Sequence, residues 1–338
     1  MAEPIVLILM HVWHYVQNTL GMFFNSVLIY LCIYHTPKVI RVYSILLLNF
    51  GITDFLTCAT DFFVFQRVIP SKTALLFISN GPCTLLGPEV CFIGYTIMLH
   101  LYMHAQWSLL MSFAYRYYIL IRPAPHRKFI VLILIAIYIP SAFQLITFLL
   151  GNENIEEVKA HLHEMYPHYD LTNKTVTGSV DITHKWYVMY TIIYMTVLTT
   201  PIYIAILILR RKIIVKLSQN VGSMSRATET IHRQLLQALT LQALLPACFM
   251  VGVICYASGQ LGFYTSPPLE FLILLSLGII PMSAPLISLY YVKSYRNKLI
   301  FFYYKFCSKK NKVMDYHTET VSYVDGGSSI RNAPTVSK

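Results

Sequence analysis

The sequence predicts an all-α membrane protein, a bundle of seven transmembrane helices with its N-terminus outside the cell and its C-terminus in the cytosol. Of its 338 residues, 56% are hydrophobic and only 12% are charged, about half the charged fraction of a soluble domain. The apolar residues form seven stretches of about 20 residues or more, which is the length that a helix needs to cross a hydrocarbon core. Because the backbone in lipid has to satisfy its own hydrogen bonds, each stretch is expected to be helical.

One transmembrane domain, residues 1–292, holds all seven stretches. We expect the helices at residues 12–34, 43–65, 90–119, 129–150, 186–209, 235–258 and 269–292. The segments between them contain the expected helix breakers, prolines such as Pro37, Pro82 and Pro123. After the domain we expect a juxtamembrane amphipathic segment at residues 293–312, and then a disordered cytoplasmic tail at residues 313–338.

The distribution of lysine and arginine predicts the orientation. Of the 26 basic residues, 21 fall in the segments after the first, third, fifth and seventh helices, and these flanks are expected on the cytosolic side. The long loop at residues 151–185 is acidic, which suits the exterior. It also holds the sequon Asn173-Lys174-Thr175, so Asn173 is the predicted glycosylation site.

Composition and motifs argue against several other functions. The net charge of +11 lies beside apolar stretches and therefore does not indicate nucleic-acid binding. No phosphate-binding loop, dinucleotide fingerprint or nucleophile motif occurs, so we expect neither an enzyme nor a cofactor. No lysine falls within a predicted span, which disfavours a retinal Schiff base.

Two acids lie in the second predicted span. Asp54 and Asp61 are seven residues apart, so they share one helical face at a separation of about 10 Å. Because an ionised group at membrane depth is costly, such groups normally face the bundle. We interpret Asp54 as a cation or proton site at mid-membrane and Asp61 as a group that lines an outer pocket. The alternative is that both are protonated and hydrogen-bonded to neighbouring helices.

The third predicted span offers Glu89 at its outer mouth and two histidines, His100 and His104, on one face. The histidine spacing suits a metal, but two ligands without a third make no metal site, and none is predicted. The histidines either pack inside the bundle or contact a ligand. With Asp61, these three residues are the candidate ligand-binding residues.

Several positions resemble the motifs of rhodopsin-like G-protein-coupled receptors. An Asn and an Asp lie five apart in the second span, an Arg-Tyr pair ends the third and is followed by proline, and prolines interrupt the sixth and seventh. The residues concerned are Asn49, Asp54, Arg116, Tyr117, Pro123, Pro246 and Pro285. The resemblance implies a bundle of that receptor type that signals to a heterotrimeric G protein, with these residues coupling ligand to partner.

The departures from that pattern are informative. Tyr115 stands where an acid usually precedes the arginine, Leu244 replaces a tryptophan, and Ala284 replaces an asparagine. Cys91 occupies the position of the receptor family's disulfide cysteine, yet the long outer loop contains no cysteine to pair with it. Cys83 or Cys255 is the substitute partner.

A nematode group is a better match. Residues 80–83, 91–95, 98–104 and 112–120 resemble the serpentine chemoreceptors of class delta, and the likeness extends over essentially the whole chain. It implies a chemosensory receptor for a small-molecule odorant or pheromone in the plasma membrane, in the cilium of a sensory neuron.

Two other functions remain open at this level. One is a ligand-gated channel or transporter with seven spans, although no inverted repeat is present. The other is an orphan scaffold or co-receptor, which the missing tryptophan and asparagine allow. In the juxtamembrane segment, basic and aromatic residues alternate as in a helix on the lipid bilayer surface, and Cys307 is placed for palmitoylation.

Overall fold

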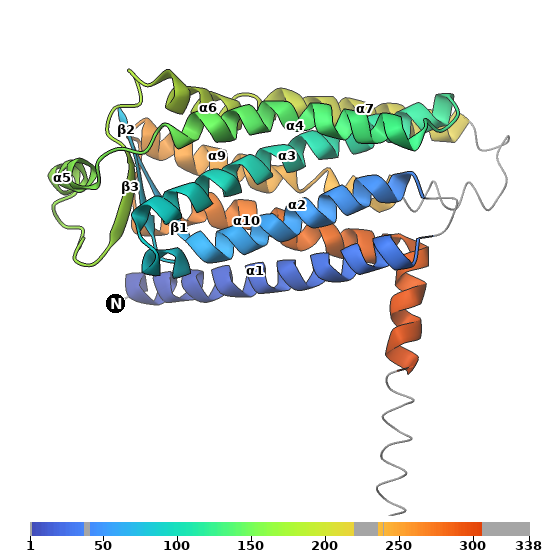
Figure 1. Ribbon diagram of the computed structural model, residues 1–338, viewed down its shortest axis with the longest axis horizontal. Coiled ribbons are helices and arrows are strands. Elements are labelled where there is room, and N and C mark those ends of the chain that lie inside the picture. Colours follow the sequence, from blue (N-terminus) through green and yellow to red (C-terminus); the bar gives the residue numbers. More distant parts are fainter. Residues whose placement is uncertain (1, 37–40, 220–235, 239, 306–338) are drawn as a thin grey trace, which may run out of the picture.

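The computed structural model describes residues 2–36, 41–219, 236–238 and 240–305. Long helices run back and forth along one axis and form an elongated bundle (Figure 1). Its helices are α1 (Ala2–Tyr34), α2 (Tyr43–Val64), α3 (Pro88–Ile121), α4 (Arg127–Leu149), α6 (Trp186–Thr196), α7 (Thr199–Gln219), α9 (Pro246–Gln260) and α10 (Pro267–Tyr291). Within the described part of the chain, six segments are long and apolar enough to cross a membrane, and α6 and α7 together form one of them.

Helix α3 crosses the bundle in addition to these six segments and is more polar than they are. It lies inside the bundle, packed against α2, α4 and α7. It has 34 residues, and many of its polar side chains, including His100, Gln106 and Ser112, are buried. A helix that is surrounded by other helices does not need a lipid-facing apolar surface, which explains its lower apolarity.

Prolines mark two breaks in the crossing helices. The fifth crossing is interrupted between α6 and α7 at residues 197–198, shortly before Pro201, and the sixth contains a turn at residues 243–245 before α9 begins at Pro246. Proline lacks the backbone donor and its ring clashes with the preceding turn, so both breaks have a local cause. Helix α1 begins at Ala2, ten residues before the start at residue 12 that was predicted from the sequence.

A three-stranded antiparallel sheet caps one end of the bundle, although only helices were predicted from the sequence. Its order is β1 (Gln66–Ser71), β2 (Ala74–Ser79) and β3 (Thr175–Ser179). The first two strands form a hairpin, and β3 comes from the long loop, with Phe77 opposite Thr177. A segment between α2 and α3 is thus joined to one between α4 and α6.

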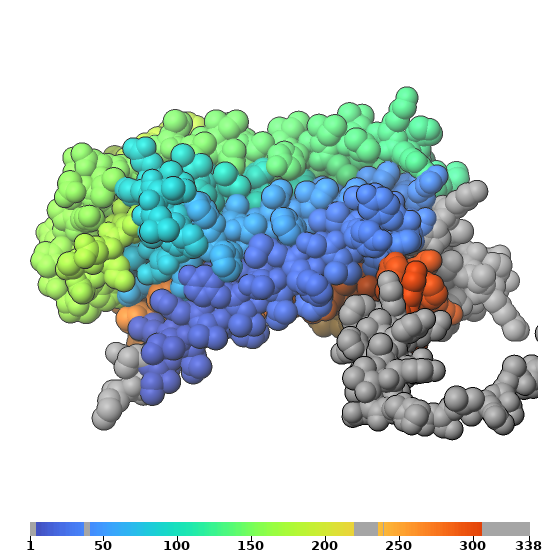
Figure 2. All heavy atoms as spheres, turned by 60° about the horizontal axis from the view of Figure 1, so that its bottom comes forward, coloured from blue at the N-terminus to red at the C-terminus, as the bar shows by residue number. Residues whose placement is uncertain are grey.

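The two faces of the sheet bury different neighbours. Leu75 and Phe77 point to the bundle, whereas Leu76 and Ile78 point away from it. The outward residues pack against α5 (Ile155–Met165) in a small core of their own. This alternation is the period of two expected for a strand with both faces covered. Helix α5 and the long loop cover the capped end of the bundle, shown in green and lime in Figure 2.

We call the end with the sheet the outer end and the opposite end the inner end, following the orientation predicted from the charges. At the inner end, residues 293–305 form a helix that runs across the bundle axis (Figure 1). Tyr295 of this helix is fully buried, and its hydroxyl lies 3.0 Å from the Thr36 hydroxyl. Cys307 and the predicted tail lie outside the described residues.

Candidate functional site

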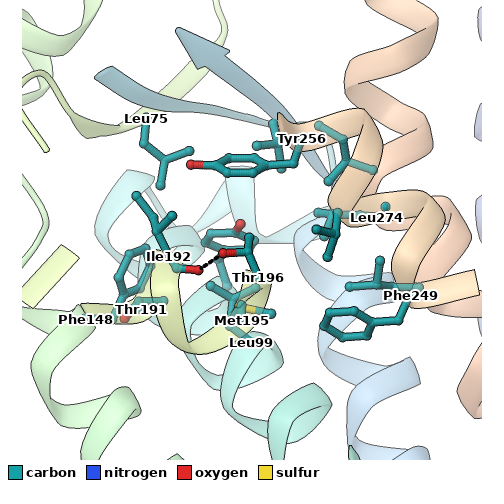
Figure 3. Close-up of a pocket in the computed structure, with 16 residues that line it drawn as sticks. Leu75, Leu99, Phe148, Thr191, Ile192, Met195, Thr196, Phe249, Tyr256 and Leu274 are labelled. Carbon is teal, nitrogen blue, oxygen red and sulfur yellow. Dashed lines mark hydrogen bonds between the residues drawn. The ribbon is translucent and has the colours of Figure 1, made fainter. Parts of the chain in front are cut away.

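A cavity of about 70 Å³ lies in the outer half of the bundle, directly under the sheet. Helices α3, α4, α6, α9 and α10 form its walls, and β1 and β2 form its roof (Figure 3). The lining is mainly aliphatic and aromatic, with Leu75 from the roof, Leu99 from α3, Ile192 from α6, Phe249 from α9 and Leu274 from α10. Among the residues that the structure describes, no Asp, Glu, Lys, Arg or His side chain belongs to this lining.

Four hydroxyl-bearing residues contribute to the lining of this outer cavity, namely Tyr95, Thr191, Thr196 and Tyr256. The Thr196 hydroxyl donates to the backbone carbonyl of Ile192 at 2.6 Å, which is ordinary for a threonine inside a helix. An apolar cavity with a few polar groups is the usual form of a small-molecule site.

A cluster of polar contacts fastens the roof to the bundle. On β1, the Arg67 Nε donates to Glu270 Oε2 of α10 at 2.5 Å, and the guanidinium lies 4.6 Å from the ring centroid of Tyr169. The Tyr169 hydroxyl donates to the other oxygen of Glu270 at 2.7 Å. Burial, reinforced by the neighbouring Glu270 carboxylate, raises the pKa of Tyr169, which keeps the phenol a donor. The three residues join the sheet, the long loop and α10.

Asp61 lies in a buried polar cluster between α1, α2 and α10, and it does not line the outer cavity. Asn18 Nδ2 donates to Asp61 Oδ2 at 2.8 Å, and His14 Nδ1 lies 3.7 Å from the same oxygen. Gln17 is fully buried next to Gly278, where a Cβ would approach Gln17 Nε2 to 2.2 Å. Glycine at residue 278 therefore lets α1 bring its amide side chains against α10.

The two histidines of α3 face α4 and α2. The rings of His100 and His104 lie 4.8 Å and 4.5 Å from the ring of Tyr138, centroid to centroid. His104 Nε2 lies 3.3 Å from Asn49 Oδ1, and Asn49 donates to the Ser108 hydroxyl at 2.9 Å. The pair thus joins three helices. Among the described residues, no group of three or more metal-ligating side chains gathers.

Glu89 lies in the first turn of α3 and is exposed. None of the four candidate ligand-binding residues therefore lines the outer cavity. The sequence reasoning missed the residues that do, because they are mostly apolar. One signal was available, since Phe249, Gly252 and Tyr256 recur at helical spacing and lie on one face of α9.

A second, smaller cavity of about 30 Å³ lies nearer the middle of the bundle. Asp54 lines it together with Gln106 of α3, Gln242, Pro246 and Pro281. Gln242 Nε2 donates to the Ser288 hydroxyl of α10 at 3.0 Å. Asp54, the predicted mid-membrane acid, therefore lines the same cavity as Pro246, which follows the turn in the sixth crossing.

Arg116 is buried at the inner end of α3, where its guanidinium carbon lies 3.7 Å from the ring centroid of Tyr43 at the start of α2. No acid forms an ion pair with it among the described residues. The adjacent Tyr117 is half-buried, with Lys212 Nζ 5.9 Å from its ring. Pro123, in the segment after α3, is exposed, and Pro285 is buried inside α10 without breaking it.

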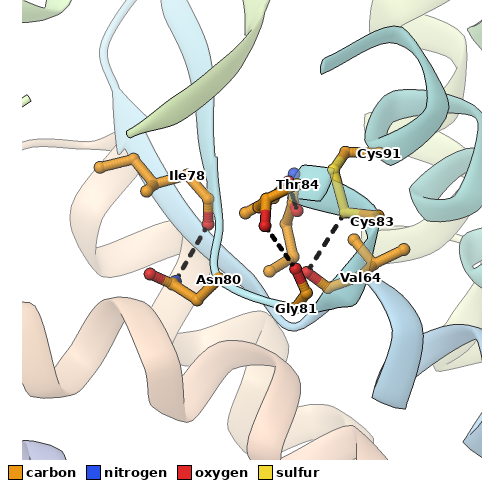
Figure 4. Close-up of a disulfide and its surroundings, with 9 residues drawn as sticks. Val64, Ile78, Asn80, Gly81, Cys83, Thr84 and Cys91 are labelled. Atoms are coloured by element: carbon orange, nitrogen blue, oxygen red, sulfur yellow. Dashed lines mark hydrogen bonds between the residues drawn. A yellow bond between two sulfur atoms is a disulfide. The ribbon is translucent and has the colours of Figure 1, made fainter. Parts of the chain in front are cut away.

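The outer end carries two further predicted sites. Cys83 and Cys91 form a disulfide that joins the segment before α3 to its first turns (Figure 4), and Cys255 is a free, buried thiol. Thr84 Oγ1 donates to the carbonyl of Gly81 at 2.9 Å in the same turn. Asn173 is exposed in the long loop with a φ of 57°, so its side chain is accessible for glycosylation.

Three comparisons bear on these features. The family described as "Serpentine type 7TM GPCR chemoreceptor Srd" matches residues 10–301. The chain is 37% identical to serpentine receptor class delta-19 of Caenorhabditis elegans over 87% of its length and 88% of that protein. It is 31% identical to serpentine receptor class delta-1 of the same organism over 83% of its length and 77% of that protein.

The fold matches that of squid rhodopsin with a TM-score of 0.61 at 10% sequence identity, over 87% of this chain and 85% of that one. The prediction of a seven-helix membrane bundle is therefore confirmed, with α3 as the third crossing in addition to the six apolar segments. The predicted resemblance to class delta is confirmed as well. The chain belongs to the Srd family of serpentine seven-transmembrane G-protein-coupled chemoreceptors.

Proposed function

We propose that this receptor binds a small-molecule odorant or pheromone in its outer cavity and signals to a heterotrimeric G protein at its inner end. The observation that carries the proposal is the outer cavity itself, an apolar chamber between five helices under a sheet. Such a chamber in the outer half of a bundle suits a small ligand, and family membership supports a chemosensory role.

Coupling between the two ends would run through shared helices. Helices α3, α9 and α10 line both the outer cavity and the Asp54 cavity, and α3 continues to Arg116. The turn before Pro246 gives the sixth crossing a hinge beside Asp54. A ligand shifts this bundle toward an open inner end only if it binds that state more tightly than the closed one.

The receptor would cross the plasma membrane with its sheet outside and Arg116 on the cytosolic side, as its charges predict. The helix at residues 293–305 would lie on the inner leaflet, with exposed Phe301, Tyr303 and Tyr304 in the lipid and Lys298 at the headgroups. We propose the cilium of a sensory neuron as its location, glycosylation at Asn173, and palmitoylation of Cys307. Nucleic acid is not a proposed partner.

The test is ligand-evoked G-protein activation by Arg116→Ala and by wild type at equal surface expression, using a panel of volatile compounds. Arg122→Ala serves as the matched control, because Arg122 ends the same helix and is exposed. We expect Arg116→Ala to lose activation and Arg122→Ala to keep it. Undiminished activation in Arg116→Ala would refute the role assigned to this residue.

A further inference from the structure

Tyr256 presents an unsatisfied hydroxyl to the outer cavity. Its ring extends from α9 across the cavity beneath Leu75 of the roof (Figure 3). The hydroxyl oxygen is buried, and it has no hydrogen-bond partner among the described residues. A buried hydroxyl without a partner costs free energy, and a bound molecule that supplies the partner recovers that free energy.

The position of Tyr256 is held by close packing one turn before it. At Gly252, a Cβ would lie 2.3 Å from a methyl group of Leu277 and 2.7 Å from the carbonyl oxygen of Ile273. Glycine thus allows α9 to lie directly against α10, and the phenol is presented from a well-packed helix. A donor that is fixed before binding loses less entropy when it meets a ligand.

Size and charge restrict the ligand further. A cavity of about 70 Å³ holds about five to seven water-sized groups, because each needs roughly 10–15 Å³. The described lining has no charged side chain, so an ionic ligand would be buried without a counter-ion at a large cost in free energy.

We propose that the outer cavity takes a small uncharged molecule with an apolar body and one hydrogen-bond acceptor, such as a ketone, and that the Tyr256 hydroxyl donates to that acceptor. This rests on the proposed function and specifies the ligand class for the same cavity. Tyr256 contributes specificity, and the apolar walls contribute most of the affinity.

The experiment uses the full-length receptor in lipid nanodiscs and four probes of one chain length: 2-pentanone, pentane, pentanoate and pentylammonium. Affinity is obtained from the rise of the thermal unfolding midpoint with probe concentration. Two variants each remove one hydroxyl from the lining. Tyr256→Phe removes a hydroxyl that has no partner among the described residues, whereas Thr196→Val removes one that is already bonded to Ile192.

We expect wild type to bind 2-pentanone more tightly than pentane and to bind neither charged probe. Tyr256→Phe is expected to weaken 2-pentanone binding by roughly three- to tenfold and to leave pentane unchanged, since one hydrogen bond is lost. Thr196→Val is expected to change neither affinity. The inference is overturned if Tyr256→Phe binds 2-pentanone as tightly as wild type does, or if Thr196→Val loses as much ketone affinity as Tyr256→Phe. It is also overturned if wild type binds a charged probe more tightly than the ketone, or if it binds none of the four probes.

This binding test is independent of signalling. Ketone binding without any G-protein activation would reject the proposed function and leave the ligand class standing. Signalling by a receptor that binds charged compounds in place of the ketone would reject the ligand class alone.

Discussion

The guanidinium of Arg116 packs over the ring of Tyr43 at 3.7 Å, and Tyr115 stacks on the same ring at 6.3 Å between centroids. Tyr43 begins α2 and Arg116 lies near the end of α3, so one aromatic ring fastens two helices at the inner end. Tyr115 occupies the position where an acid usually precedes this arginine. A cation–π contact therefore stabilises the Arg116 guanidinium in place of an ion pair.

Removing the ring should loosen this end of the bundle. We expect Tyr43→Leu to raise ligand-independent G-protein activation by up to about fivefold, because a cation–π contact of about 1 kcal/mol then no longer favours the closed state. Nucleotide exchange on receptor-containing membranes measures this activity. Tyr43→Phe is the matched control, since it keeps the ring. Equal basal activity in Tyr43→Leu and wild type would show that the contact between Arg116 and Tyr43 does not favour the closed state.

Loss of Arg67 should destabilise the roof. The Glu270 side chain is almost fully buried, so Arg67→Ala leaves a carboxylate without its counter-ion, and we expect the free energy of unfolding to fall by about 3 kcal/mol. The double variant Arg67→Met/Glu270→Gln should recover much of this loss. Thermal unfolding in nanodiscs measures both effects. The exposed pair of Asp181 and His184 is the control, and Asp181→Asn should leave the midpoint unchanged. If Arg67→Ala also leaves the unfolding midpoint unchanged, the contact between Arg67 and Glu270 does not stabilise the roof.

The disulfide should stabilise the outer end of α3. We expect the free energy of unfolding of the double variant Cys83→Ser/Cys91→Ser to fall by about 2–3 kcal/mol, because the unfolded chain is no longer constrained by the cross-link. Thermal unfolding under non-reducing conditions gives the difference. Cys248→Ser is the matched control, as that cysteine is free. Alkylation of Cys83 in the untreated wild type would show that the bond is absent.

The polar cluster of α1 depends on Asn18. Its side-chain amide donates to Asp61, so Asn18→Leu leaves a buried carboxylate oxygen unsatisfied, and we expect a loss of about 1–3 kcal/mol in stability. Ser26 of the same helix is the control, because its hydroxyl is exposed and bonds only within α1. Ser26→Ala should unfold like wild type. A similar midpoint for Asn18→Leu would mean that Asp61 is satisfied in another way.

The helices were predictable because lipid makes length and apolarity sufficient signals. The roof was not, since β1 contains Pro70 and its sheet is completed by Thr175–Ser179, about a hundred residues further along the chain. Such pairing depends on tertiary contacts that no local pattern encodes. Arg116 and Cys91 were singled out through motif spacing, whereas Cys83 was one of two candidate partners for Cys91.

The candidate ligand-binding residues show a second limit of prediction from the sequence. Asp61 was correctly expected on an inward helical face, yet that face meets α1 and α10, because Asn18 and Gln17 of α1 are buried there. Helical periodicity tells which side is inward, but it does not tell which neighbour lies there. Tyr256 carries no charge and matches no motif, and its unsatisfied hydroxyl in a cavity was visible in the structure alone.

The central claim is that occupancy of the outer cavity drives activation at the inner end. The most direct measurement is odorant-evoked nucleotide exchange in membranes that contain Val253→Phe or Ile254→Phe at equal surface expression. Both lie on α9, but Val253 lines the cavity and Ile254 is exposed on the surface of the bundle. We predict that the added ring of Val253→Phe fills the cavity and abolishes the response, whereas Ile254→Phe responds like wild type. A full response from Val253→Phe would contradict the account.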